Sequence, residues 1–193
     1  MIICLDNGHA KSTPGKRSPD GKLLEYAWTR EIVKRLSDKL QANGYKTYIV
    51  TPETDVDVSL KERCRRINKV YKDNNKQAIS ISIHINAAGS GASWLTARGW
   101  QVYISPNASS KSKKLAQCLY NEAKKANLKG NRSVPKEEYW VSNLAMCRDT
   151  NCPAVLTENL FMDNKEDVKY LLSEEGKETI VNLHYNAIVN YLS

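Results

Sequence analysis

Residues 78–84 read Ala-Ile-Ser-Ile-Ser-Ile-His, and this stretch gives the clearest indication of how the chain folds. Its three isoleucines alternate with serines, which is the two-residue period of a β-strand that buries one face. Segments with helical periodicity lie on both sides of it in the sequence. Strands that alternate with helices predict an α/β sandwich, in which a largely parallel central sheet carries helices on both faces.

Four other segments are predicted to be strands, because each is a short apolar run beside turn residues. The last of them begins with proline, which a first strand position tolerates. The ranges are residues 2–6, 45–50, 99–105 and 153–158. Two stretches without a period, residues 8–21 and 129–140, are predicted to be loops, and the second is expected to border a substrate groove.

Helices are predicted from apolar residues that recur every three or four positions. The first begins at Glu25 and ends at Asn43-Gly44, and the second opens with Ser59 and Glu62, which resemble a capping box. A third helix follows the strand at residues 99–105. Two more complete the chain, the shorter of them capped by Asn164. The predicted buried residues are Trp28, Ile32, Leu36 and Leu40 in the first helix, Leu60, Cys64, Ile67 and Tyr71 in the second, Leu115, Cys118, Leu119 and Ala123 in the third, and Ile180, Leu183, Ala187, Ile188 and Tyr191 in the last.

The composition is that of an ordinary globular protein, with 193 residues, of which 41% are hydrophobic and 26% charged. We expect one domain over residues 1–193. The net charge of +8 favours approach to polyanions such as nucleic acid, anionic lipid or a cell wall that bears teichoic acid. The basic residues are spread over predicted helices, and for clusters such as Arg63, Arg65 and Arg66 we expect solvated helix faces.

The five cysteines form an odd set without the paired spacing of a zinc ribbon, so no disulfide framework is expected. Cys4, Cys64 and Cys118 fall at apolar positions and are predicted to be buried, reduced thiols. Cys147 and Cys152 could be linked or free. The chain enters an apolar strand without a leader peptide and contains no membrane-spanning run, which predicts synthesis as a soluble cytoplasmic chain.

Two histidines and two glutamates fall where the carboxyl ends of the predicted strands meet, which is where sites gather in such sheets. His9 follows the first strand, and His84 ends the Ile-Ser strand. Glu25 opens the first helix, and Glu158 ends the last predicted strand. Two imidazoles and a carboxylate suit zinc, which in catalytic sites leaves a fourth position for water. Another carboxylate can take the proton of that water, and Glu158 is the candidate for this role.

Each of these residues also has a structural explanation. A histidine at a strand end is often hydrogen bonded within the fold, an acid in a first helical turn is stabilised by the helix dipole, and an acid that ends an apolar strand can form a salt bridge. Asn86 could orient His84, contact a substrate or form a turn. His184 is expected to be a hydrogen-bonded surface or boundary residue of the last helix.

Four ordered blocks resemble the zinc-dependent N-acetylmuramoyl-L-alanine amidases of cell-wall remodelling, spores and phage endolysins. The family's Asp-Ala-Gly-His-Gly block corresponds to residues 6–10, and its second-ligand acid corresponds to Glu25 in Leu-Leu-Glu-Tyr. Its Ser-Ile-His-x-Asn-Ala block matches residues 82–87, and its Pro-Ala-Val-Leu-x-Glu block matches residues 153–158. The family's Leu-x-x-Arg is similar to residues 60–63.

The resemblance implies an amidase that cuts peptidoglycan between N-acetylmuramic acid and L-alanine. It implies that His9, Glu25 and His84 bind Zn²⁺, and that Glu158 is the catalytic acid/base. The departures from the family's first block are Asn7 for alanine and an alanine for the glycine after the histidine. These departures bear on the shape of the loop more than on metal ligation.

Other functions stay open at this point. A zinc peptidase that cuts within the stem peptide would use the same chemistry, and a non-catalytic domain that binds cell wall or nucleic acid would explain the +8 charge. Nucleic acid is the weaker candidate, because no recognition module is visible. Peptidoglycan is the expected partner, and a monomer is favoured. The cell wall is the expected site of action, as for a phage lysin that a holin releases, with a host enzyme exported by another route as the alternative.

Overall fold

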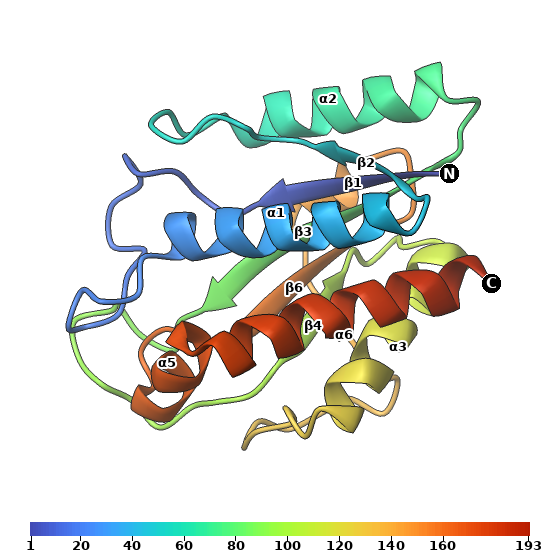
Figure 1. The fold of residues 1–193 in the computed structure, drawn as a ribbon. Helices are drawn as coiled ribbons and strands as arrows, with labels where there is room; N and C mark the ends of the chain where they lie inside the picture. The colour runs from blue at the N-terminus through green and yellow to red at the C-terminus, as the bar shows by residue number, and fades with distance from the viewer.

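The computed structural model describes all 193 residues and contains one six-stranded sheet with helices on both faces (Figure 1). The strands are β1 (Ile2–Asn7), β2 (Lys46–Ile49), β3 (Ala78–Asn86), β4 (Gln101–Ile104), β5 (Trp140–Val141) and β6 (Ala154–Phe161). The helices are α1 (Glu25–Ala42), α2 (Leu60–Asp73), α3 (Ser110–Lys125), α4 (Ala145–Arg148), α5 (Lys165–Leu172) and α6 (Glu174–Leu192). The predicted α/β class is confirmed.

The sheet has the strand order β2-β1-β3-β6-β4-β5. The strands from β2 to β6 in this order are parallel, whereas β4 pairs antiparallel with β6 and parallel with β5. The carboxyl ends of β1, β3 and β6 therefore lie at one edge of the sheet, beside the amino end of β4. This edge brings together side chains that are far apart in the sequence.

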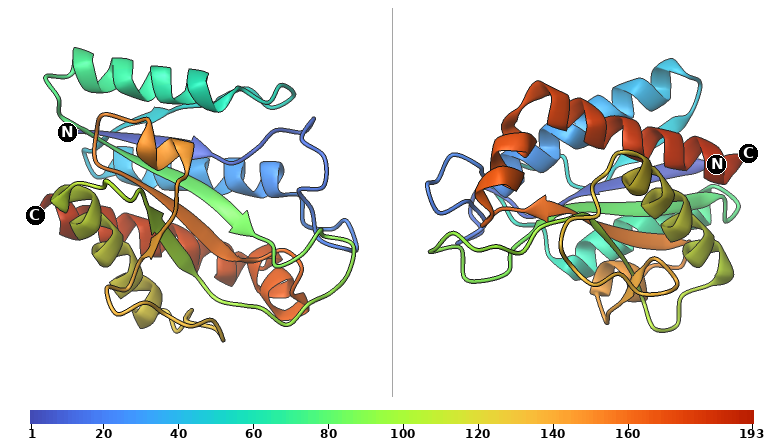
Figure 2. Two further views of the ribbon diagram at one scale, coloured as in Figure 1. Left: turned by 180° about the vertical axis from the view of Figure 1, so that it is seen from behind. Right: turned by 90° about the horizontal axis from the view of Figure 1, so that it is seen from below.

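Two apolar layers cover the sheet. On one face α1, α3 and α6 enclose a core of 32 buried residues, and on the other α2 and α4 cover a cluster of 7. Figure 2 shows α1 and α6 on one side of the sheet and α2 and α4 on the other. Ile79, Ile81 and Ile83 of β3 belong to the larger core, and burial of each stabilises the fold by about 1.5–3 kcal/mol. Their burial fixes the register of β3, so His84 points toward the opposite face.

The helix ends follow from their capping residues. The Ser59 side chain accepts a hydrogen bond from the Glu62 amide at 3.3 Å, which is half of the predicted capping box. The reciprocal half is not formed, because the Glu62 carboxylate pairs with Arg65 and Arg66 instead. The prediction that Asn164 caps α5 is confirmed, since its side chain accepts two backbone amides.

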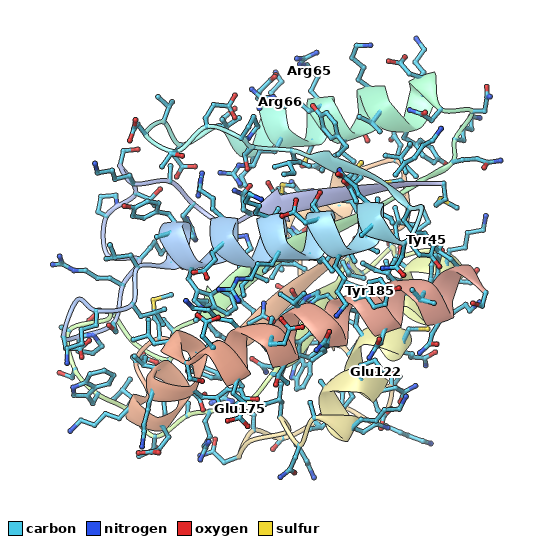
Figure 3. All side chains as sticks on the ribbon, in the orientation of Figure 1. Tyr45, Arg65, Arg66, Glu122, Glu175 and Tyr185 are labelled. Atoms are coloured by element: carbon cyan, nitrogen blue, oxygen red, sulfur yellow. The ribbon has the colours of Figure 1, made fainter.

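The expectation of a solvated face was wrong for Arg63. Its side chain is 3% exposed and pairs with buried Asp6. Arg65 of the same helix is exposed, whereas Arg66 is half-buried and donates to the Val50 carbonyl (Figure 3). The difference arises because Arg63 lies on the face of α2 that packs toward the sheet, which charge patterning along the sequence cannot reveal.

Two short elements were not predicted. The expected loop at residues 129–140 runs into the two-residue strand β5 at Trp140, and α4 has only four residues. Both elements are too short for a period to be visible in the sequence. All five cysteines are free, including Cys147 and Cys152. Cys4 and Cys64 are buried as predicted, whereas Cys118 is only half-buried. No helix of the protein combines the length and the apolar character that a membrane span needs.

Candidate active site

His9 and His84 are placed by adjacent parallel strands. β1 ends two residues before His9 and pairs along its length with β3, which carries His84. The backbone φ of His9 is 58°, in the left-handed region that few non-glycine residues adopt. Surrounding contacts must hold such a backbone in place. The His9 carbonyl accepts a hydrogen bond from Arg30 Nη1 at 2.9 Å, and the Gly8 carbonyl accepts one from Thr29 Oγ1 at 3.1 Å.

The first residue of α1, Glu25, reaches both histidines. Its Oε1 lies 3.1 Å from His84 Nδ1 and accepts the Ile85 amide at 3.0 Å. Its Oε2 lies 3.7 Å from His9 Nε2 and makes no hydrogen bond. The two imidazole rings lie 5.1 Å apart at an angle of 88°. One ligand atom from each of the three residues lies within 4.8 Å of the other two, so the residues predicted to share a metal do converge.

The group of His9, Glu25 and His84 fits a metal ion of the zinc type. Two imidazoles and one carboxylate match the donors that zinc prefers, and three protein ligands leave a fourth position open. Glu25 Oε2 is buried without a partner, and a cation would satisfy it. Gly8 leaves the space that His84 occupies, because a Cβ at this glycine would lie 2.5 Å from His84 Nδ1.

The charges of this group depend on one another. Burial raises the pKa of Glu25, but the hydrogen bond and charge of His84 outweigh burial, and the pKa is lowered. Burial lowers the pKa of His84, but the bond to Glu25 and the charges of Glu25, Glu158 and Asp6 together outweigh it, and the pKa is raised. Burial lowers the pKa of His9 to about 4, against the attraction of Glu25. His9 is therefore neutral at pH 7, as a metal ligand must be.

Glu158 lies beside His84 on the next strand. The two residues are register partners in the pairing of β3 with β6, so their side chains leave the sheet on the same face. Glu158 Oε2 is enclosed and makes no hydrogen bond, so the alternative of a salt bridge is not supported. Burial raises the pKa of Glu158 to about 7, although His84 lowers it. A carboxyl group with this pKa can both take up and release a proton near neutral pH.

A buried ion pair supports the loop that carries His9. Asp6, at the end of β1, is 0% exposed, and its Oδ1 accepts from Arg63 Nη1 at 2.9 Å. The same Nη1 donates to the Asn7 carbonyl at 2.8 Å, and the Ser82 hydroxyl donates to Asp6 Oδ2. The pair therefore ties β1, β3 and α2 together directly beneath the site. Only the Leu-x-x-Arg resemblance pointed to Arg63 in the sequence.

Gln101 and Tyr103 of β4 lie on the far side of Glu158, and Asn86 of β3 is hydrogen bonded to Gln101 across β6. Gln101 is the register partner of Glu158 in the antiparallel pairing of β4 with β6. Gln101 Oε1 accepts from Asn86 Nδ2 at 2.7 Å and from the Tyr103 hydroxyl at 3.3 Å. Asn86 is thus a strand residue that holds Gln101. No sequence signal pointed to Gln101, because its position depends on the register of three strands.

His184 lies away from this site, and the prediction of a surface or boundary residue was wrong. It is 0% exposed. Its Nε2 lies 3.0 Å from Thr157 Oγ1, and its Nδ1 lies 2.8 Å from the Ile180 carbonyl. Burial lowers the pKa of His184 to about 4. It is a neutral core histidine. Both ring nitrogens are hydrogen bonded, so the prediction of a hydrogen-bonded residue is confirmed.

The sequence matches known proteins along almost its entire length. The family model described as N-acetylmuramoyl-L-alanine amidase matches residues 3–190. The chain is 28% identical over 192 residues to the endolysin of Bacillus phage SPP1, which covers 100% of this chain and 66% of that protein. It is 26% identical over 206 residues to the germination-specific N-acetylmuramoyl-L-alanine amidase of Bacillus subtilis (strain 168), with coverage of 100% and 80%. The chain spans only part of the length of these relatives.

Solved structures share the fold. The N-acetylmuramyl-L-alanine amidase Ami1 from Mycobacterium smegmatis superposes with a TM-score of 0.84 at 18% identity, over 100% of this chain and 96% of that one. An N-acetylmuramoyl-L-alanine amidase from Clostridium difficile 630 superposes with a TM-score of 0.81 at 24% identity, over 99% and 96%. At these identities the likeness establishes a common architecture.

Proposed function

Because the chain belongs to the N-acetylmuramoyl-L-alanine amidase family, we propose that it hydrolyses the amide bond between N-acetylmuramic acid and L-alanine in peptidoglycan. The observation that carries the proposal is the convergence of His9, Glu25 and His84, with the carboxyl group of Glu158 in register beside them. We further propose that residues 1–193 form a single catalytic domain, that peptidoglycan is its partner, and that it acts on the cell wall.

His9, Glu25 and His84 would hold zinc in this proposal. A bound zinc ion lowers the pKa of a water molecule toward ~7 and polarises the carbonyl group of the amide. The protein contributes the geometry: the Ile85 amide fixes the Glu25 carboxylate, and Gly8 leaves room for the His84 ring. The Asp6–Arg63 pair supports the loop below His9, because Arg63 also donates to the Asn7 carbonyl. The left-handed backbone of His9 in this loop places its ring near Glu25.

Glu158 moves the proton. Its carboxylate takes one proton from the attacking water, whose oxygen bonds to the carbonyl carbon of the lactyl group. It returns this proton to the alanine nitrogen as the carbon–nitrogen bond breaks, so an amine and a carboxylic acid are the products, and the acid then loses its own proton to solvent at neutral pH. A pKa of about 7 suits both steps, because the same group is a base in one and an acid in the other.

Zinc content and lysis of cell wall, measured on the same preparations, test this assignment. Glu158→Gln should retain zinc but lose about 100-fold or more in rate, since general acid–base groups contribute factors of about 10²–10⁴. His84→Ala should lose both zinc and lysis. Glu122→Gln is the matched control: Glu122 lies on α3 (Figure 3), pairs with Lys125, and should not alter the rate. Full activity of Glu158→Gln would refute the role of this carboxyl.

Mass spectrometry of digested cell wall separates the amidase from its rivals. An amidase releases peptides with L-alanine at the amino terminus and glycan with an intact lactyl group. A zinc peptidase releases fragments cut within the stem peptide. A non-catalytic wall-binding domain releases neither, and it would bind the wall equally well after Glu158→Gln.

A further inference from the structure

The side-chain amide of Gln101 has a fixed orientation. The Asn86 Oδ1 atom accepts the Ala87 amide at 2.8 Å, so its Nδ2 must be the atom that donates to Gln101. Gln101 Oε1 receives this bond and a second from the Tyr103 hydroxyl. Both lone pairs of the Gln101 oxygen are thus in use, and the network assigns its Nε2 to the opposite side.

The amino group of Gln101 is a free hydrogen-bond donor. The residue is only 3% exposed, but its Nε2 makes no hydrogen bond within the protein. That nitrogen is not fully enclosed and still reaches the surface. In the free protein this oriented NH₂ group can donate only to water, so an acceptor atom of a ligand can replace that water and take its hydrogen bond.

The order of side chains across the sheet indicates which part of the substrate would reach Gln101. His84, Glu158 and Gln101 are successive register partners on β3, β6 and β4, spaced at about 4.8 Å per strand. In the proposed reaction the carbonyl group of the amide lies on the His84 side, and Glu158 serves the departing nitrogen. The peptide beyond that nitrogen therefore continues toward Gln101. One extended residue spans about 3.3–3.6 Å, which brings its carbonyl oxygen to the Gln101 side.

We propose that Gln101 is a specificity residue that donates a hydrogen bond from Nε2 to the carbonyl oxygen of the first stem residue, L-alanine. Asn86 and the Tyr103 hydroxyl act through Gln101 as positioning groups. The assignment rests on the proposed amidase function, because it uses the direction in which the stem peptide leaves Glu158. A donor at Gln101 Nε2 requires a hydrogen-bond acceptor at the L-alanine carbonyl position of the substrate, and a donor group at that position would gain nothing.

A pair of substrates that differ only at this carbonyl tests the proposal. One is a muramoyl dipeptide, and the other has a thioamide sulfur in place of the L-alanine carbonyl oxygen, which keeps the following N–H group and the charge but accepts a hydrogen bond more weakly. Wild type should lose about 3- to 10-fold in kcat/KM on the analogue, as expected for one neutral hydrogen bond. Gln101→Leu should lose as much on the normal substrate and show no further loss on the analogue. Gln41→Leu, the same change on the exposed end of α1, should behave as wild type.

The ratio of kcat/KM for the normal substrate to kcat/KM for the analogue, measured on one variant, does not depend on how much of that variant folds. An equal ratio in wild type and Gln101→Leu would overturn the assignment while leaving the amidase function intact. Failure of wild type to cut either substrate at the muramoyl bond would overturn the function, and with it this inference. As a second readout, calorimetry should show the free stem peptide binding several-fold more weakly to metal-free Gln101→Leu than to metal-free wild type.

Discussion

Removal of Arg63 should destabilise the fold and the site together. Its guanidinium group is 3% exposed and faces Asp6, which is 0% exposed, at 2.9 Å. It also donates to the carbonyl groups of Asn7 and Val58, each at 2.8 Å. Arg63→Met would leave the Asp6 carboxylate buried without its counter-charge, which typically destabilises a protein by about 3–5 kcal/mol. Against a total of about 5–15 kcal/mol for a typical domain, this is a large fraction.

Urea unfolding followed by fluorescence of the four tryptophans measures this loss. Arg65→Met is the matched control, because Arg65 pairs with Glu62 on the exposed side of the same helix, and its loss should change the free energy of unfolding by less than about 1 kcal/mol. The double variant Asp6→Asn with Arg63→Met should be more stable than the sum of the single variants predicts, by about 1–3 kcal/mol.

Zinc affinity should fall together with stability in Arg63→Met, because Asp6 and Asn7 lead directly into the loop that carries His9. Two results would refute the view that Asp6 and Arg63 neutralise each other's buried charge. One is a loss of less than about 1 kcal/mol in Arg63→Met, and the other is a double variant in which the two single effects simply add.

Two other changes test the packing around the site and the core. Gly8→Ala should abolish metal binding while Gly44→Ala does not, since a Cβ at Gly8 would lie 2.5 Å from His84 Nδ1 and the one at Gly44 meets no atom within 4 Å; zinc titration of Gly8→Ala with wild-type affinity would contradict this. Stability should also fall in acid through His184, whose pKa is about 4 in the folded protein and about 6.5 when unfolded. Because the unfolded chain binds the proton more readily, the stabilisation is complete above pH 6.5 and is lost toward pH 4, by about 2 kcal/mol between pH 7 and pH 5. His184→Gln, measured without metal, should show a flatter dependence of unfolding free energy on pH, and an unchanged dependence would refute the assignment.

Local patterns were enough to predict the fold class, and the family resemblance singled out the four residues that we propose for the site. The alternation of residues 78–84 indicates a strand with His84 near its carboxyl end, and in the structure β3 continues to Asn86. Glu25 was found because it opens a helix and Glu158 because it closes a short apolar run, and the family's blocks contain both. The prediction that the strand ends at Glu158 was wrong, because β6 continues to Phe161. Convergence of the four residues then required only that neighbouring strands be parallel.

What the sequence did not reveal depends on contacts between distant segments. The burial of Arg63 requires knowing which face of α2 meets β1. The role of Asn86 requires the register of β3, β6 and β4, since its partner Gln101 lies 15 residues away on a strand that is not its neighbour. His184 looked like a boundary residue because its partner Thr157 belongs to another element. These are tertiary relations, and no periodicity along one segment encodes them.

Diffraction at the zinc absorption edge from crystals grown with zinc tests the central claim most directly. One anomalous peak, within about 2.0–2.2 Å of a donor atom of each of His9, Glu25 and His84, is the expected result. Glu158 should lie beside the fourth position without binding the ion. A peak at another place, or none between these three side chains, would contradict the account.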